Sequence, residues 1–335
     1  MSLPKFMVMK SAGGDIHVPS VGFGTYASGD NRWCYDATLH ALRSGYRHLD
    51  CAWHYGVDEQ VGAAIRDSGI PRRELFITSK FWPQFGAPEN VEKCLQLCLR
   101  NMHIDYIDLF LAHWPLALQA RSNISTAKAF PDATNDEKAI ATTAEGKPIV
   151  DWSHTCESIA YANGHKGGFR ATWEAMQRLV GTGKVRAVGV SNFNITQLQE
   201  VLSVGGTVPL SCHQVEAHPW FPNTGLLDFM REQGILRTVY CPFAGQKRSG
   251  MSLVEDPLVT ALAEKNRMGV GQLLQSWAVQ RGTIPLGKSQ SPARIEANLD
   301  VRALPQEDVD ALNGMDQGSQ GRTVDMGPKW GVSLY

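Results

Sequence analysis

The stretch Ile107-Asp-Leu-Phe-Leu-Ala-His113 is a short, mostly apolar run that ends in a polar residue. A run of this length and composition is typical of a buried β-strand. Similar runs recur at residues 21–24, 46–49, 75–78, 185–190, 211–215, 236–240 and 283–286. Segments with helical periodicity lie between most of them, at residues 31–44, 58–68, 90–102, 169–180, 194–204, 224–233 and 257–280. This alternation predicts a parallel α/β architecture, either a closed barrel or a doubly wound open sheet.

The residues that follow the strands distinguish these two architectures. Nearly every predicted strand ends in a polar side chain, namely Asp50, Lys80, His113, Ser191 with Asn192, Gln214, Tyr240 and Lys288. An open sheet forms its site at one switch point, which two or three strands supply. A barrel collects residues from the carboxyl ends of all its strands. Because no predicted strand is followed by Gly-x-Gly-x-x-Gly, we interpret Gly22-Phe-Gly24 as a tight turn. The sequence therefore predicts a (β/α)8 TIM barrel of the α/β class.

Three segments depart from the alternation. Residues 4–19 hold Gly13-Gly14-Asp15 between two short β-like runs, which predicts a hairpin outside the barrel that closes its lower end. Residues 117–168 have no sustained period and are predicted to form an inserted loop after the fourth strand, either facing the substrate or without a role. Residues 316–335 are predicted to form a C-terminal loop.

Composition limits the classes of function. The chain has 335 residues, of which 43% are hydrophobic, and its formal net charge is −1 at pH 7. These values predict a soluble globular protein, which we interpret as a single domain over residues 1–335. The near-zero charge argues against nucleic acid or an anionic membrane as a partner, and no apolar run is long enough to span a bilayer.

The cysteines and the N-terminus bear on location. The seven cysteines have no zinc-type spacing and their number is odd, so we expect reduced thiols and no metal site. Met1-Ser-Leu-Pro-Lys5 shows no basic segment followed by an apolar one, so no secretory signal is expected. The cytoplasm is the predicted location.

Four polar residues at or just after neighbouring strand ends suggest a catalytic site. Asp50 ends the second strand and Tyr55 follows five residues later, whereas Lys80 and His113 end the third and fourth strands. A lysine in a barrel mouth needs a counter-charge, for which Asp50 is the candidate. A lysinium beside a phenol favours tyrosinate, so we expect the pKa of Tyr55 to fall from about 10. Tyr55 would then donate a proton to a developing alkoxide, while His113 orients the carbonyl.

None of these side chains delivers a hydride, so a cofactor is required. The region after the eighth strand supplies cations: Lys288 with Ser289, and Arg294 in a helix that Pro292 opens. Cations beside a helix N-terminus suit a phosphate group, which barrels often bind at this position.

The chain resembles the aldo-keto reductase superfamily from Gly22 to Asn298. The motifs that carry this resemblance are Gly45-Tyr-Arg-His-Leu-Asp50, Gly189-Val-Ser-Asn-Phe193, Gln214-Val-Glu-Ala-His-Pro219 and Tyr240-Cys-Pro-Phe243. It looks most similar to the aldehyde and polyol reductase branch that includes xylose reductases and glycerol dehydrogenases. The resemblance implies a catalytic tetrad of Asp50, Tyr55, Lys80 and His113.

The resemblance also implies NADPH, bound extended across the barrel mouth. In that reading Tyr240 stacks on the nicotinamide, and Ser191, Asn192 and Gln214 hold its carboxamide. The resemblance further implies that Lys288, Ser289 and Arg294 bind the adenosine 2′-phosphate. Asn298 would contact the adenine. One departure concerns the eighth strand, which at Ile284-Pro-Leu-Gly-Lys-Ser289 is two residues longer than the commoner Ile-Pro-Lys-Ser and shifts Lys288 in its loop.

Substrate contacts are predicted from aromatic residues. The candidate walls are Trp53, Trp82, Trp114 and Trp330. For Trp53 and Trp330, packing without ligand contact is an equally good interpretation. The walls are compatible with a sugar, a triose, a sugar acid or a ketone.

Three functions are therefore compared. The leading hypothesis is the NADPH-dependent reduction of an aldehyde or ketone, reversible toward alcohol oxidation, with a small-molecule carbonyl substrate. A Schiff-base lyase that uses Lys80 is an alternative, although a Schiff-base lysine must be neutral and Asp50 opposes this. A non-catalytic NADPH-binding regulatory protein is another. The protein is expected to be a monomer or a homodimer.

Overall fold

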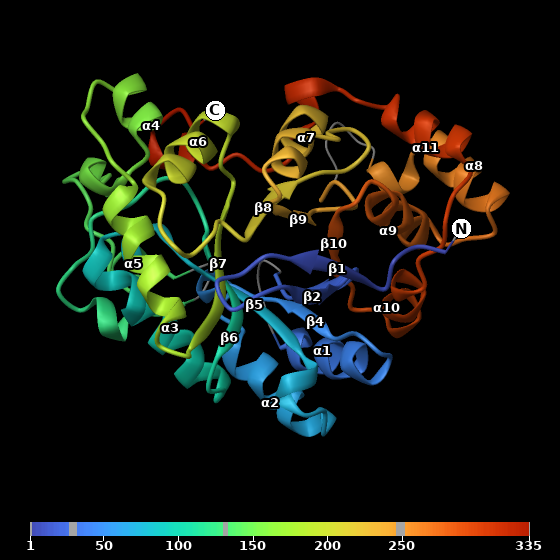
Figure 1. Cartoon of the computed structure of the whole chain (residues 1–335), viewed down its shortest axis with the longest axis horizontal. Helices are drawn as coiled ribbons and strands as arrows, with labels where there is room; N and C mark the ends of the chain where they lie inside the picture. The colour runs from blue at the N-terminus through green and yellow to red at the C-terminus, as the bar shows by residue number, and fades with distance from the viewer. Residues whose placement is uncertain (1, 27–31, 130–132, 246–251, 335) are drawn as a thin grey trace.

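The computed structural model describes residues 2–26, 32–129, 133–245 and 252–334. In this part of the chain, parallel strands close a barrel in the order β10-β3-β4-β5-β6-β7-β8-β9, which confirms the predicted architecture (Figure 1). The barrel strands are β3 (Gly22–Gly24), β4 (His48–Asp50), β5 (Phe76–Phe81), β6 (Ile107–Ala112), β7 (Val185–Ser191), β8 (Cys212–Glu216), β9 (Leu236–Tyr240) and β10 (Ile284–Gly287). The register pairs Gly24 with Asp50 and Asp50 with Thr78, so neighbouring strands end at one rim. The interpretation of Gly22-Phe-Gly24 as a tight turn is wrong, because these residues form β3 and pair with β10 and β4.

Helices surround the barrel and bury their apolar faces against it. They are α1 (Trp33–Arg43), α2 (Asp58–Ser68), α3 (Pro88–Met102), α5 (Arg170–Val180), α6 (Ile195–Val204), α7 (Thr224–Glu232), α8 (Pro257–Lys265), α9 (Val270–Gln280), α10 (Pro292–Leu299) and α11 (Gln306–Asn313). The first residue of the helix predicted at 31–44 lies outside the described residues.

The helix predicted over residues 257–280 is wrong as a single element. It divides into α8 and α9, because Arg267 takes a left-handed backbone with φ +53° and Gly269 becomes the N-cap of α9. Apolar residues on both sides keep a helical spacing, so the pattern alone hides the break. Helix α11 was not predicted.

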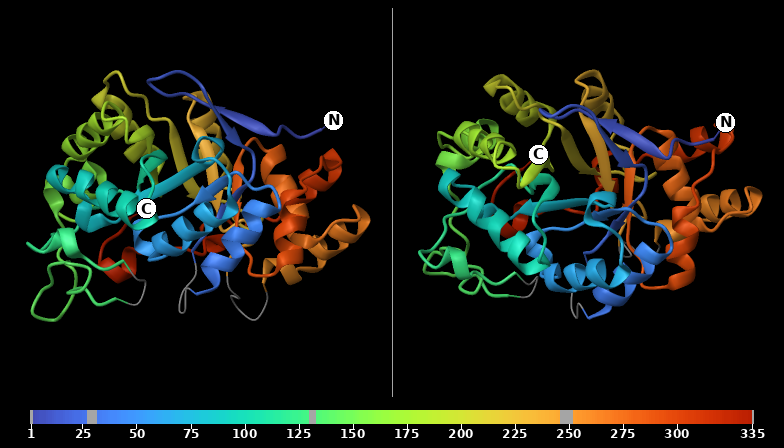
Figure 2. Two further views of the ribbon diagram at one scale, coloured as in Figure 1. Left: turned by 90° about the horizontal axis from the view of Figure 1, so that it is seen from below. Right: turned by 60° about the horizontal axis from the view of Figure 1, so that its bottom comes forward.

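The predicted N-terminal hairpin is confirmed. Strand β1 (Phe6–Met9) pairs antiparallel with β2 (Ile16–Pro19) and lies across one end of the barrel (Figure 2). Met9, Ile16 and Val18 pack with the first residues of β5, β8, β9 and β10. The hairpin therefore closes the amino-terminal end and leaves the carboxyl end of the strands as the mouth.

The described residues of the 117–168 insertion contain regular structure that the sequence pattern did not predict. Isolated antiparallel bridges join Leu118 to Val150 and Ala120 to Ile140, and the short helix α4 (Glu157–Ala162) follows. The carboxylate of Glu200 on α6 accepts hydrogen bonds from the backbone N–H groups of Glu157 (2.8 Å) and Ser158 (2.9 Å). This contact satisfies the free donors of the α4 N-terminus and ties the insertion to the barrel.

The C-terminal segment, described here as residues 316–334, contains a 3-10 turn (Gly318–Gly321) and the short helix α12 (Gly327–Trp330). It brings Trp330 against Trp82 and Trp114, which follow β5 and β6. Among the described helices, none combines the length and the apolar composition that a membrane span needs.

Candidate active site

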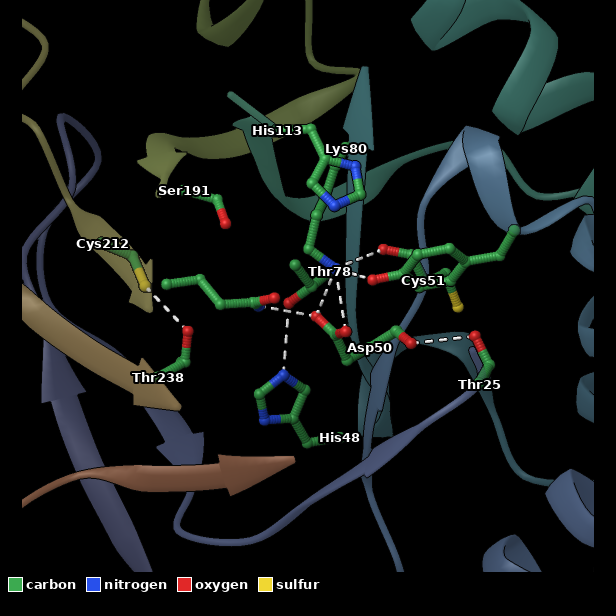
Figure 3. A network of polar contacts seen from close by, with 12 residues as sticks. Thr25, His48, Asp50, Cys51, Thr78, Lys80, His113, Ser191, Cys212 and Thr238 are labelled. Atoms are coloured by element: carbon green, nitrogen blue, oxygen red, sulfur yellow. Dashed lines mark hydrogen bonds and ion pairs between the residues drawn. The ribbon is translucent and has the colours of Figure 1, made fainter. Parts of the chain in front are cut away.

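Lys80 is at the centre of a polar network in the barrel mouth (Figure 3). Its ammonium group donates hydrogen bonds to Asp50 Oδ2 (2.8 Å), Asp50 Oδ1 (2.9 Å) and the carbonyl oxygen of Cys51 (2.8 Å). Lys80 is fully buried and Asp50 is 3% exposed. A buried charge of this kind persists only with such partners, so the predicted Lys80–Asp50 ion pair is present with its full set of contacts.

Tyr55 comes to the same ammonium group from a different element. It ends a 3-10 turn (Trp53–Tyr55) and its hydroxyl oxygen lies 3.2 Å from Lys80 Nζ. Gly56 follows with φ +64°, a left-handed conformation that ends the turn and suits glycine. The turn after β4 therefore aims the phenol at the end of β5.

The expected direction of the Tyr55 pKa shift is wrong for the protein alone. Burial raises the pKa of Tyr55 well above its usual value, and the carboxylate of Asp50 raises it further. The expectation named Asp50 as the partner of Lys80, but it did not include the burial of the phenol or the repulsion between Asp50 and a tyrosinate. The phenol is therefore protonated at neutral pH, as a proton donor must be.

His113 follows β6 and completes the group. Its ring lies edge-on to the Tyr55 ring, with centroids 5.8 Å apart. Its Nδ1 is buried without a hydrogen-bond partner in the described residues. Burial lowers the pKa of His113 well below its usual value, and Lys80 adds to the effect. A neutral imidazole can donate a hydrogen bond from one ring nitrogen and accept one at the other.

Side chains from three further strand ends join this centre. Gln214 Nε2 donates to Asp50 Oδ1 (2.8 Å), and Asn192 Nδ2 donates to the carbonyl oxygen of His113 (2.9 Å) and to Ser191 Oγ (3.1 Å). The hydroxyl of Tyr240 donates to Asn192 Oδ1 (2.6 Å). Asn192 has φ +67°, a conformation that asparagine tolerates better than most residues. Residues predicted separately from the sequence thus form one connected rim.

The predicted phosphate-binding residues form a second, separate cluster between β10 and α10. Lys288 Nζ lies 4.5 Å from the ring centroid of Trp33, and Ser289 Oγ accepts from the backbone N–H of Ser291 (3.1 Å). Arg294 is exposed in the first turn of α10, and Asn298 is buried near its end. Within the described ranges, neither cation forms an ion pair with a carboxylate.

The two extra residues of the eighth strand remain in the barrel. Leu286 and Gly287 pair with Gly22 and Phe23, and Lys288 is the first residue after β10. The longer strand therefore keeps Lys288 at the rim, in the connection that leads to α10 and Arg294.

Three of the four predicted tryptophan walls gather beside the tetrad. The Trp330 ring packs edge-on against Trp82 (5.8 Å between centroids) and Trp114 (5.4 Å), and Trp82 packs edge-on against His113 (5.0 Å). Trp53 does not fit a wall role, because it is fully buried and packs against Phe85. The 3-10 turn directs Trp53 into the core and its neighbour His54 toward Trp82.

Two residues at the mouth were missed from the sequence. The His54 ring stacks on Trp82 with centroids 3.6 Å apart, and burial lowers the pKa of His54 to about 3. Tyr26, 48% exposed, lies with its ring 5.0 Å from that of Tyr55. Tyr26 follows a strand end, the same criterion that identified the other residues, but it was not applied to the first barrel strand.

Comparison with known proteins agrees with this geometry. Residues 20–317 match the model of the aldo/keto reductase family. The chain belongs to this family. It is 35% identical over 327 residues to a glycerol 2-dehydrogenase (NADP(+)) of Hypocrea jecorina, covering 95% of each chain. It is 36% identical over 320 residues to the aldehyde reductase YPR1 of Saccharomyces cerevisiae, covering 94% of this chain and 92% of that protein.

A solved structure extends the likeness to three dimensions. An aldose reductase from Schistosoma japonicum is 29% identical and superposes with a TM-score of 0.79, covering 97% of each chain. As an aldo/keto reductase, the protein is an oxidoreductase that reduces carbonyl groups. The described residues contain no group of three or more His, Cys, Asp or Glu side chains arranged to hold a metal ion.

Proposed function

We propose that this aldo/keto reductase reduces an aldehyde or ketone to the alcohol with NADPH, reversibly, and that Tyr55 is the general acid. The observation that carries the proposal is the buried ammonium of Lys80, which contacts both the carboxylate of Asp50 and the hydroxyl of Tyr55. A small-molecule carbonyl compound in the barrel mouth is the proposed substrate. The cytoplasmic location and a monomeric or homodimeric state stay predictions.

The residues present suit a nicotinamide dinucleotide. Ser191, Asn192 and Gln214 bring hydroxyl and amide groups to the mouth, where a carboxamide has both a donor and acceptors to satisfy. The half-buried ring of Tyr240 provides a flat surface beside them. In the described chain, Lys288 and Arg294 have no carboxylate partner. Their positive charges are therefore available to bind a 2′-phosphate. The NADP(+) named for the glycerol 2-dehydrogenases supports the same cofactor.

Each residue of the tetrad has a distinct role in this proposal. NADPH supplies the hydride that no side chain provides. Tyr55 donates its proton to the carbonyl oxygen of the substrate, and Lys80 stabilises the negative charge that Tyr55 then carries. Asp50 binds the ammonium group of Lys80 through both carboxylate oxygens and holds it in place. His113, held neutral by burial, hydrogen-bonds the substrate oxygen and sets its distance from Tyr55.

The geometry disfavours the lyase alternative. A Schiff base forms on a neutral, accessible amine. Lys80 instead is fully buried and bonded to both oxygens of Asp50. The regulatory alternative shares every contact of the cofactor site, so only turnover separates it from the reductase.

The first test is a fluorescence titration with NADPH and NADH in parallel, followed by turnover of 4-nitrobenzaldehyde. Tight NADPH binding with turnover is the expected result. Binding without turnover of any activated aldehyde would favour the regulatory alternative. Failure to bind either nucleotide would overturn the proposal. The next experiment would then be borohydride trapping on Lys80, which tests the Schiff-base alternative.

A further inference from the structure

Glu216 is a buried carboxylate that the proposed reaction does not use. It ends β8 and is 1% exposed. Its oxygens accept hydrogen bonds from the backbone N–H groups of Thr323 (2.6 Å) and Val324 (2.9 Å) and from the hydroxyl of Thr323. The imidazole Nε2 of His218 lies 2.9 Å from Oε1. Two consecutive backbone groups of the C-terminal segment are thus held by one side chain of the barrel.

The charge on Glu216 suits this role. Burial raises the pKa of Glu216, but the hydrogen bonds from His218 and Thr323 outweigh it and bring the pKa below its usual value. Hydrogen bonds to an ionised acceptor are shorter and stronger than those between neutral groups. The contact is therefore a firm one at neutral pH.

The start of this segment is held by contacts with the turn after β8: Gly321 packs closely on the carbonyl oxygen of Trp220, which also accepts from the Gln317 N–H (3.0 Å). A cavity of about 520 Å³ lies between this segment and the turns that follow β7 and β8, and its lining includes Asp316, Ser319, Arg322 and Glu216. None of the tetrad residues lines it. The hydrogen bonds from residues 323 and 324 to Glu216 come next along the chain, between these contacts and Trp330, and so direct the chain toward the mouth.

Trp330 lies six residues after Val324 on this path. It is 6% exposed and packs against Trp82 and Trp114, beside His113. A second tether follows, where Gln197 Nε2 on α6 donates to the carbonyl oxygen of Leu334 (3.1 Å). Trp330 is thus bracketed by an anchor on β8 and an anchor on α6.

We infer that Glu216 is a positioning residue for substrate recognition. By fixing residues 323–324 it holds Trp330 against Trp82 and Trp114, and so sets the wall that an aromatic or other bulky carbonyl substrate contacts. Small aldehydes that reach only Tyr55 and His113 do not depend on it. The inference rests on the proposed reductase function for its kinetic readout.

The kinetic test compares Glu216→Gln, Trp330→Ala and the double variant. Glutamine replaces one acceptor oxygen with a donor, which opposes the N–H of Val324. We expect Glu216→Gln to raise KM for 4-nitrobenzaldehyde about tenfold, with kcat and the KM for propionaldehyde within about twofold of the original protein. Because Glu216 acts through Trp330, the double variant should be no worse than Trp330→Ala alone.

Multiplying effects in the double variant, or an unchanged KM ratio between the two aldehydes, would overturn the inference. Glu307→Gln, which removes an exposed ion pair with Lys265, is the matched control and should change neither KM. Thr323→Val removes the hydroxyl that donates to Glu216 and also contacts the Cys241 thiol, and it keeps the buried carboxylate. It should shift the KM ratio in the same direction by a smaller amount, which keeps the test valid if Glu216→Gln folds poorly.

Hydrogen exchange supplies a readout that does not need turnover. Glu216→Gln should speed amide exchange in residues 323–334 and leave β5 unchanged. Unchanged exchange at 323–334 would refute the anchor even if the protein is an active reductase. Faster exchange in a protein without turnover would refute the proposed function and keep the anchor.

Discussion

The two polar clusters at the barrel rim differ in burial and in pairing. Lys80 is fully buried and bonded to Asp50, Cys51 and Tyr55. Lys288 is half-buried and Arg294 exposed, and neither has a carboxylate partner in the residues that the structure describes. Charges in a dry interior interact strongly and are costly to leave unpaired, whereas exposed charges are screened by water and salt. The cluster around Lys80 is thus suited to catalysis, and the cluster around Lys288 and Arg294 is suited to ligand binding.

This contrast predicts that changes in the buried centre reduce rate or stability, and that changes in the exposed cluster reduce affinity alone. Four experiments test it, in decreasing order of the expected effect.

Tyr55→Phe removes the proton donor and leaves the ring in place. We expect kcat for an aldehyde to fall about 10³-fold, because general acid catalysis contributes about 10²–10⁴-fold. NADPH affinity by fluorescence titration should change less than twofold. A variant that retains more than a tenth of the activity would show that Tyr55 is not the acid.

Asp50→Asn leaves the ammonium of Lys80 buried without its counter-charge. The free energy of unfolding in urea should fall by about 3–5 kcal/mol, since breaking a buried pair strands the remaining charge. Arg294→Met, the control from the exposed residue of the second cluster, should change it by less than about 0.5 kcal/mol. Equal decreases in the free energy of unfolding of the two variants would contradict the proposed difference between the clusters.

Acid should destabilise the buried region through its histidines. Burial lowers the pKa of His48 to about 4, and that of His54 and His213 to about 3. The unfolded chain, with histidine pKa values of about 6.5, therefore binds protons first as the pH falls. Stability is complete above pH 6.5 and decreases toward pH 4, by up to about 1.4 kcal/mol per pH unit for each histidine.

Urea unfolding between pH 7 and 4.5 measures this slope. The His213→Gln variant has a side-chain oxygen long enough to accept from the Phe193 N–H, as His213 Nε2 does (3.1 Å), and should lower the slope because it does not titrate. A stability that is flat over this range would contradict the burial of neutral histidines.

Lys288→Met and Arg294→Met should produce the smallest changes. Each should raise the Kd for NADPH about five- to tenfold, because an exposed charge pair contributes about 1 kcal/mol, and the Kd for NADH should stay constant. At saturating NADPH, kcat should be unchanged. Added salt should reduce the difference between the original protein and the variants. Equal increases in the Kd for NADPH and for NADH would mean that these cations do not bind the 2′-phosphate.

The barrel was predictable because its evidence is local and repeated. Each buried strand is a short apolar run, and a polar residue ends it. The same regularity located Asp50, Lys80 and His113, since the ends of parallel strands meet at one rim. Elements without such a pattern, such as α4 and α11, were missed because tertiary contacts stabilise them more than their own periodicity does.

Side-chain direction and electrostatics were decided by the tertiary structure. Trp53 and His54 are consecutive in the sequence, but the 3-10 turn directs them to opposite sides. Trp53 packs on Phe85, and His54 packs on Trp82. It placed Lys80 beside Tyr55, yet the sign of the Tyr55 pKa shift depends on burial and on Asp50.

The sequence by itself determined the fold class, the family motifs and the types of residue at the strand ends. Only the tertiary structure decided which of these groups are dry, which are paired, and that Glu216 holds a segment more than 100 residues further along the chain. The physical reason is that periodicity is a property of neighbours in sequence, whereas burial and charge balance depend on every element packed around a group.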